Sequence, residues 1–290
     1  MYKIAILGVE NTHANSFLSL IKDDPRFSDI EVVGVYTNEP RAAENIKEKF
    51  GVYCAQSYDE FVGKIDGLVI TARDGANHYK YAKPYIPSGI PMYIDKPFCY
   101  DEDEAMQFAR ELKAAGCRIT GGTILIHAHF IKCLKECVKG NVYGKTYGGF
   151  FRSPVNLENR YGGFFFYGQH LGQMIQEVFG YYPNSVVAER RDNIVNVNIK
   201  YDEYTVNGQY VDGNYNYFAS ISCENTTFGQ AFPTTPDLSA TEFMGFYKLL
   251  KGEKMESSYQ DIVATVNLVT AIDRAMKSGK EEAVAPVGEI

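Results

Sequence analysis

Short apolar runs alternate with segments of helical spacing over the first part of the chain. Apolar runs at 3–7, 31–36 and 67–71 are each followed by a helical pattern. Continuous apolar strands separated by helices are typical of a parallel sheet covered on both faces. With two more strands expected at 91–95 and 118–120, the pattern predicts a doubly wound α/β domain of the Rossmann type.

The helices of this domain, residues 1–122, are expected at 15–22, 40–50, 58–62, 78–85 and 101–115. The last of them has the clearest start, because Asp101 can cap it and the three acidic residues that follow complement its dipole. Gly116 is expected to end it.

Alternating polar and apolar positions replace this pattern in the second part of the chain. Strands are expected at 195–201, 209–211 and 215–222, with turns at 207–208 and 212–213. Helices are expected at 168–179, 241–250 and 258–278. We therefore predict an α+β domain with a large open antiparallel sheet over residues 123–290, whose terminal helices can pack back on the first domain.

Composition narrows the class of partner. The 290 residues are 45% hydrophobic, which is enough for two domains with sizeable cores. A net charge of -7 without a basic tract argues against nucleic acid, which needs clustered Lys and Arg. Because we see neither a long apolar run nor a leader, we expect a cytoplasmic protein with no membrane contact and a small-molecule partner.

The stretch IAILGVENTHANSF near the start is similar to a dinucleotide-binding loop that has lost two glycines. Gly8 ends the first apolar run, as the first glycine of such a loop does. Glu10 and His13 stand where the other two glycines are expected, with Asn11 and Thr12 between them. A carboxylate there would weaken pyrophosphate binding and an imidazole would crowd the helix, so we predict weak cofactor binding.

The segment GIPMYIDKPF resembles the Gfo/Idh/MocA family of glucose-fructose oxidoreductase and inositol dehydrogenase, as a divergent member. In that family an E-K-P triplet leaves the nucleotide-binding domain with the catalytic lysine, and here the triplet is Asp95-Lys96-Pro97. IDGLVITARDGANHYKYA, YGGFFFYGQH and the terminal helical segment are similar to further landmarks of the family in the same order. The resemblance covers nearly the whole chain and implies a nicotinamide cofactor and, most often, a sugar or polyol substrate.

The resemblance also implies catalytic roles for Lys96 and His170. A lysine at the carboxyl edge of a parallel sheet can exchange a hydroxyl proton, and partial burial would lower its pKa. The family usually has an acidic residue four places before the histidine and another three places after, where this chain has Phe166 and Gln173. The usual proton relay is therefore incomplete, although Lys96 with His170 could still handle one proton.

The end of the second strand lacks the acid that binds the ribose in NAD-dependent enzymes. Thr37 and Asn38 stand there, and Arg41 opens the next helix. An arginine without that acid would tolerate a 2′-phosphate, so the cofactor is NADP or NAD with a slight preference for NADP. If the geometry of the family holds, the cofactor site is completed by Thr71, Arg73, His78, Asp95 and Lys96.

The IHAHF stretch places two histidines two residues apart, where an extended chain would point both the same way. The resemblance puts His127 and His129 at the rim of the active site, with Arg152 and Tyr167 as further substrate-binding candidates. A divalent metal held by these histidines and His170 is a minority alternative to a site without metal. The six cysteines lack paired CxxC spacing and are expected to be free thiols.

The main hypothesis is an NAD(P)-dependent oxidoreductase that transfers hydride to or from a CH–OH group of a sugar-like or polyol substrate. Two alternatives remain: a non-redox ligand-binding or regulatory protein on the same fold, and a lyase or isomerase that uses Lys96 and the histidines. The open sheet leads us to expect a homodimer or homotetramer.

Overall fold

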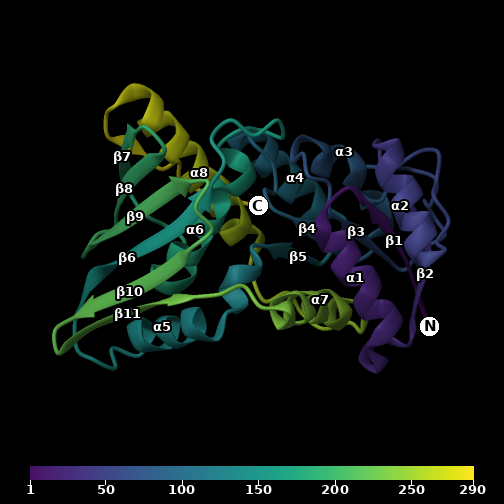
Figure 1. The fold of residues 1–290 in the computed structure, drawn as a ribbon, viewed down its shortest axis with the longest axis horizontal. Coiled ribbons are helices and arrows are strands. Elements are labelled where there is room, and N and C mark those ends of the chain that lie inside the picture. The colour runs from purple at the N-terminus through teal and green to yellow at the C-terminus, as the bar shows by residue number, and fades with distance from the viewer.

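The first of two sheets lies in the half of the molecule that contains the N-terminus (Figure 1). The computed structural model describes all 290 residues. The strands of this sheet, all parallel and in the order β2-β1-β3-β4-β5, are β1 (Tyr2–Leu7), β2 (Ile30–Tyr36), β3 (Gly67–Ile70), β4 (Met92–Asp95) and β5 (Ile119–Gly122). The helices between them are α1 (Thr12–Asp23), α2 (Pro40–Phe50), α3 (Ala76–Ala82) and α4 (Glu102–Ala114), with short 3-10 turns η1 (Pro25–Phe27) and η2 (Ile86–Ser88). The predicted doubly wound fold is confirmed.

The central strands of this sheet are covered on both faces, as the apolar runs predicted. Every residue of β3 and β4 is buried. The helix expected at 58–62 is wrong, because this segment forms turns that end at Gly63, whose φ is +73°. Five residues are too few to form a stable helix without strong tertiary packing.

The second sheet is large, open and mostly antiparallel, as expected. Its strands, in the order β11-β10-β6-β9-β8-β7-β12, are β6 (Thr146–Val155), β7 (Ser185–Arg191), β8 (Ile194–Lys200), β9 (Thr205–Asp212), β10 (Tyr217–Cys223), β11 (Thr226–Phe232) and β12 (Glu282–Ala283). Only β6 and β9 pair in parallel. The turn expected at 207–208 is wrong, because both residues lie inside β9, which is hydrogen-bonded to β6 on one side and β8 on the other.

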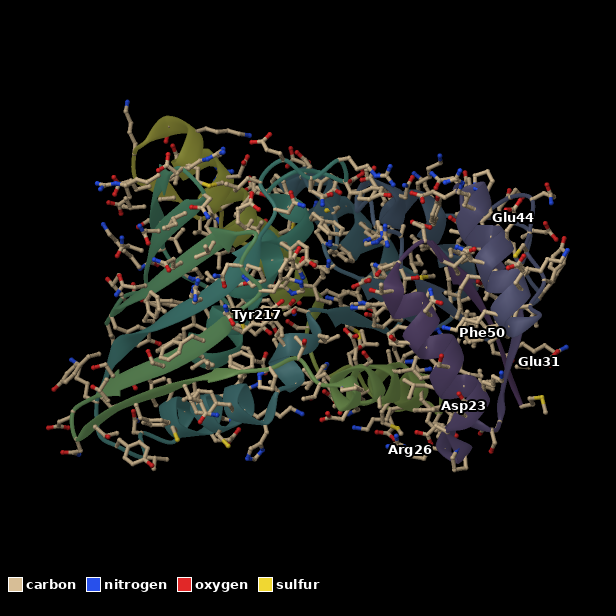
Figure 2. The ribbon with its side chains drawn as sticks, in the orientation of Figure 1. Asp23, Arg26, Glu31, Glu44, Phe50 and Tyr217 are labelled. Carbon is tan, nitrogen blue, oxygen red and sulfur yellow. The ribbon has the colours of Figure 1, made fainter.

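Helices of the second half bring the two sheets into one molecule. They are η3 (Ile124–His127), α5 (His129–Lys139), α6 (Phe165–Phe179), α7 (Pro236–Leu250) and α8 (Tyr259–Ser278). The α6 helix lies against β6 and β9, and Tyr217 at the start of β10 lies near the middle of the molecule (Figure 2). None of the helices combines the length and the apolar character that crossing a membrane requires.

The α7 helix returns to the first domain and completes its core. Phe243 lies 4.9 Å, between ring centroids, from both Phe17 of α1 and Phe27. Phe246 and Tyr247 belong to the same buried cluster. In α8, Val263 and Val266 pack into the core on the other face of the sheet, so both terminal helices contact the first domain. This return carries one acidic side chain of α7 close to the end of β4.

Candidate functional site

The predicted catalytic lysine directly follows β4 and lies where α6 meets the first sheet. Its Nζ donates a hydrogen bond of 3.1 Å to the carbonyl of Phe166 and lies 4.4 Å from the centroid of that ring. The ring of Tyr167 is 5.2 Å away. The side chain is 6% exposed, and burial lowers the pKa of Lys96 although the charge of Asp95 opposes this. A lysine so placed can release a proton more readily than one in water.

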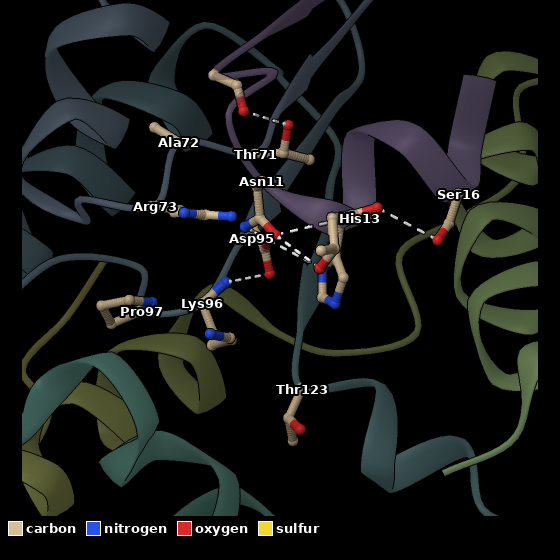
Figure 3. A network of polar contacts seen from close by, with 12 residues as sticks. Asn11, His13, Ser16, Thr71, Ala72, Arg73, Asp95, Lys96, Pro97 and Thr123 are labelled. Atoms are coloured by element: carbon tan, nitrogen blue, oxygen red, sulfur yellow. Dashed lines mark hydrogen bonds and ion pairs between the residues drawn. The ribbon is translucent and has the colours of Figure 1, made fainter. Parts of the chain in front are cut away.

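Asp95 connects this lysine with the loop after β1 (Figure 3). Its Oδ1 accepts the backbone N–H of Lys96 at 2.7 Å, and its Oδ2 accepts the side-chain amide of Asn11 at 2.9 Å. Nδ1 of His13 lies 2.9 Å from the same Oδ2. Burial disfavours the charged form of Asp95, but the charges of His13 and Lys96 hold its pKa below the ordinary value.

His13 was expected to crowd the helix approach, and this is wrong. Its ring turns inward to Asp95 and keeps 16% exposure, so α1 begins at Thr12 without obstruction. Burial lowers the pKa of His13, but the carboxylates of Asp95 and Glu242 outweigh it and raise the pKa above its ordinary value. The imidazole therefore acts as the cation that balances a buried carboxylate.

Glu242 of α7 is a buried acid that we did not identify from the sequence. Neither of its carboxyl oxygens makes a hydrogen bond, and the hydroxyl of Tyr93 nearby also lacks a partner. Burial raises the pKa of Glu242 to about 8, while the charge of His13 opposes the rise. The helical spacing of the sequence could have indicated that Glu242 is buried. It shares a helix face with the buried Leu238 and Phe246, which lie four residues to either side.

Glu242 predicts an unusual dependence of stability on pH. The folded pKa of this carboxyl lies above its ordinary 4.5, so the folded state binds its proton more tightly and stability falls as pH rises from about 4.5 to about 8. The raised pKa of His13 acts in the same direction at higher pH. Glu242→Gln should therefore increase the free energy of unfolding by about 1–3 kcal/mol at pH 8.5 and little at pH 5.

Urea unfolding at the two pH values measures this difference. Glu44→Gln, which changes an exposed acid on α2, is the matched control and should alter neither value. An equal effect of Glu242→Gln at both pH values would show that the carboxyl stays ionised in the fold.

His170 lies in α6 on the side that faces the first sheet. Its Nδ1 is 2.6 Å from Oγ1 of Thr123, and the residue is 6% exposed. Burial lowers the pKa of His170 well below its ordinary value, and the charge of Lys96 adds to this, so the ring is neutral near pH 7. The side-chain oxygen of Gln173, where the family has an acid, accepts the N–H of Thr123 at 2.9 Å. Gln173 therefore fixes the backbone of Thr123, and the hydroxyl of Thr123 in turn orients the ring of His170.

The loop after β1 retains the tight turn of a dinucleotide-binding site. Gly8 has a φ of +89°, and a Cβ there would come within 2.2 Å of the backbone nitrogen of Ala72, so only glycine fits. The hydroxyl of Thr71 donates to the carbonyl of Gly8 at 3.1 Å. The ring of His78 lies between the carbonyls of Pro97 and Ala72, at 2.7 and 2.9 Å.

The side chains of Thr71 and His78 therefore stabilise the loops after β1, β3 and β4 through hydrogen bonds to backbone carbonyls. Both are fully buried, and we expected them to line the path of the cofactor. Each side chain is hydrogen-bonded to backbone carbonyls beneath the loop, and their place along the cofactor path stays a prediction.

The start of α1 fits a phosphate group. The amides of Glu10 and Thr12 donate to no acceptor within the protein, and they lie at the positive end of the helix dipole. The carboxylate of Glu10 does not approach them, because it is bound elsewhere: Oε2 accepts the hydroxyl of Thr37 at 2.7 Å and Oε1 accepts the N–H of Arg73 at 3.0 Å. A dinucleotide could thus be held by the loop in spite of the missing glycines.

A segment before α6 crosses to the end of β2. The hydroxyl of Tyr161 donates to Glu39 at 2.6 Å, and the guanidinium of Arg160 lies 3.4 Å from the same carboxylate. Arg73 lies over the ring of Tyr161, 5.9 Å from its centroid. We did not foresee these contacts, because no short motif links residues so distant in the chain.

The remaining candidates do not gather at this site. His127 lies in η3, where burial lowers its pKa to about 4, and lines a separate cavity of about 40 Å³. His129 opens α5 and lies 3.4 Å from the sulfur of Cys133. The extended chain expected for this pair is wrong, because Thr123 and its neighbours start a 3-10 helix here. Arg152 lies on β6, and its buried Nε has no partner.

No three His, Cys, Asp or Glu side chains in the structure are arranged to hold a metal ion, so the metal alternative finds no ligand set. Asn38 and Arg41 are exposed beyond the end of β2, and Arg41 makes no ion pair there.

Comparison with known proteins agrees with this geometry. The family model described as "Oxidoreductase family, NAD-binding Rossmann fold" (Gfo/Idh/MocA) matches residues 2–123. A search of curated proteins found no match. Among solved structures, a probable dehydrogenase from Thermotoga maritima is 14% identical with a TM-score of 0.84, covering 97% of this chain and 99% of that one.

Two further structures are similar over nearly their whole length. Myo-inositol 2-dehydrogenase from Lactobacillus plantarum is 13% identical, with a TM-score of 0.85 and coverage of 98% of this chain and 99% of that one. Scyllo-inositol dehydrogenase from Lactobacillus casei, solved with NAD(H) and scyllo-inositol, is 13% identical with a TM-score of 0.83 and the same coverage. At such identity these structures show the fold alone. Residues 2–123 thus match the model of the Gfo/Idh/MocA family of NAD-binding oxidoreductases, and the whole chain shares the fold of inositol dehydrogenases.

Proposed function

We propose that this protein is an oxidoreductase that transfers hydride between a nicotinamide cofactor and a CH–OH group of a sugar-like or polyol substrate. One observation carries the proposal: the buried ammonium of Lys96 lies at the carboxyl edge of the first sheet against the carbonyl of Phe166. Ligands bind outside that edge in doubly wound folds. The inositol dehydrogenases that share the fold support the substrate class.

Lys96 is the acid-base group in this proposal. In the direction of oxidation its neutral amine accepts the hydroxyl proton of the substrate, and in reduction its ammonium returns it. The nicotinamide, when bound, supplies or accepts the hydride. Phe166 stands where the family usually has a carboxylate, so no anion at that position counteracts the desolvation of the ammonium.

His170 is a positioning residue in the same proposal. Its neutral ring, held at Nδ1 by Thr123, can hydrogen-bond a substrate hydroxyl through Nε2. The rings of Tyr167 and Tyr217 lie 5.2 and 6.4 Å from it and offer flat surfaces for the apolar face of a sugar. Roles for Arg152, His127 and His129 in substrate binding stay predictions.

The finer assignments also stay predictions. We assign cofactor binding to residues 1–122, and substrate binding and subunit contacts to residues 123–290. A cytoplasmic location and a homodimer or homotetramer remain expected. The preference for NADP came from Arg41 and the missing acid, whereas the contact of Glu10 with Thr37 argues for NAD.

Lys96→Met tests the assignment of the acid-base group. Methionine keeps most of the packing of the side chain but cannot exchange a proton, so kcat should fall by about 10²- to 10⁴-fold while cofactor affinity changes little. A screen of inositols, other polyols and sugars with NAD and NADP first identifies a substrate by the absorbance of the reduced nicotinamide. Lys22→Met, which changes an exposed lysine of α1, is the matched control. Wild-type turnover in Lys96→Met would refute the assignment.

The pH dependence of oxidation should show the lowered pKa of Lys96. The neutral amine is the active form in this direction, so kcat/KM should rise with pH and level off around an apparent pKa below the ordinary 10.5 of lysine. Reduction should show the opposite trend. The residual activity of Lys96→Met should lack this titration; a wild-type profile that rises only above pH 10.5 would contradict the proposal.

His170→Ala should have a smaller effect than Lys96→Met. We expect a loss of about tenfold in kcat/KM, the equivalent of one hydrogen bond, with the apparent pKa of Lys96 nearly retained. Thr123→Val removes the hydroxyl that holds the ring and should produce part of the same loss. If His170→Ala abolished the pH dependence, the histidine rather than Lys96 would carry the proton.

A further inference from the structure

We propose that Glu10 makes the protein select a cofactor with a free ribose 2′-hydroxyl over one with a 2′-phosphate. The inference rests on the proposed function, since it concerns the adenosine end of the same cofactor site. It assigns a binding role to a side chain that stands in place of a glycine of the fingerprint.

The backbone of the loop brings Glu10 to the end of β2. The amides of Gly8 and Val9 both donate to the carbonyl of Tyr36, at 2.8 and 3.3 Å, and Tyr36 is the last residue of β2. The loop is therefore drawn against this strand, and Glu10 comes to lie beside Thr37.

Two hydrogen bonds from different strand ends fix the carboxylate in this place. The hydroxyl of Thr37, which follows β2, donates to Oε2 at 2.7 Å, and the N–H of Arg73, which follows β3, donates to Oε1 at 3.0 Å. Thr37 is itself fixed, because its Oγ1 accepts the N–H of Glu39 at 3.1 Å. A side chain held at both oxygens keeps a defined position and does not move freely in solvent.

The end of β2 is where doubly wound folds bind the ribose of a dinucleotide. An acidic residue of β2 itself usually accepts the 2′-hydroxyl there. This chain has Thr37 and the exposed Asn38 instead, and Glu10 supplies a carboxylate to the same place from the neighbouring loop. An ionised carboxylate only accepts hydrogen bonds, so it suits the two hydroxyl donors of a ribose.

The same carboxylate disfavours a 2′-phosphate. That group adds a charge of about -1.5 to -2, which a nearby carboxylate repels. A second carboxylate, Glu39, lies at this end of the sheet and engages the guanidinium of Arg160 at 3.4 Å. The guanidinium of Arg73 lies over Tyr161. Arg41, exposed on α2, is the cation from which the preference for a 2′-phosphate was predicted, so it has to be tested separately.

Isothermal titration calorimetry with NAD and NADP tests the proposal without turnover. The wild type should bind NAD at least tenfold more tightly than NADP. Glu10→Gln keeps the shape and an acceptor for Thr37 but removes the charge, so the ratio of the two affinities should fall by about tenfold, or about 1.4 kcal/mol. Thr37→Val leaves the charge but removes one of its supports, and should reduce the ratio less.

Two control variants separate this effect from a general change of charge. Glu44→Gln removes an exposed acid of α2 that projects away from the site (Figure 2), and should leave the ratio unchanged. Arg41→Gln should also leave it unchanged, since the selection is ascribed to the carboxylate.

Four results would overturn the inference. An affinity ratio that Glu10→Gln does not alter, or one that Arg41→Gln alters instead, would show that Glu10 does not select the cofactor, while the proposed function stands. Tighter binding of both cofactors by Glu10→Gln would show that the carboxylate obstructs the site. If the wild type bound neither cofactor, both the inference and the proposed nicotinamide chemistry would be wrong.

Discussion

The site depends on the neutralisation of one buried carboxylate, that of Asp95. An ion of this kind costs several kcal/mol to desolvate unless its oxygens are paired, and here three groups provide the pairing. The amide of Lys96 fixes the start of the turn after β4, while Asn11 and His13 fix the start of α1. The loop after β1 and the proposed acid-base lysine are therefore coupled through one side chain. A change that frees Asp95 would disturb both together.

The side chains that replace the glycines of the loop have specific partners. Glu10 joins the ends of β2 and β3, and His13 balances the charge of Asp95. If these replacements had no partners, the side chains of Glu10 and His13 would either project into solvent or displace α1 from the sheet. The tight turn at Gly8 persists instead, and the amides of Glu10 and Thr12 stay free for an anion. These features favour a rebuilt nucleotide site over an abandoned one.

The second half of the chain contributes by covering that site. The α6 helix places the carbonyl of Phe166 and the ring of His170 against the lysine, and α7 places Glu242 behind His13. Burial beneath these helices lowers the pKa of Lys96, while the charge of Glu242 opposes the shift. The loss of the family's aspartate at Phe166 thus changes the environment of Lys96 without exposing it. A lysine with a lowered pKa is suited to exchange protons without a carboxylate partner.

The sequence by itself determined the doubly wound sheet, the open second sheet and the place of Lys96, because apolar strands, helical spacing and the triplet Asp95-Lys96-Pro97 are local signals. It could not determine where the side chains of Glu10 and His13 turn, nor that Glu242 lies beside them. Their partners are separated from them by tens to hundreds of residues, and only the packing of α7 and the parallel strands brings them together. The burial of Thr71 and His78 beneath the loop is likewise decided by tertiary structure. Local patterns fix backbone conformation, whereas the pairing of buried charges depends on distances that exist only in the folded chain.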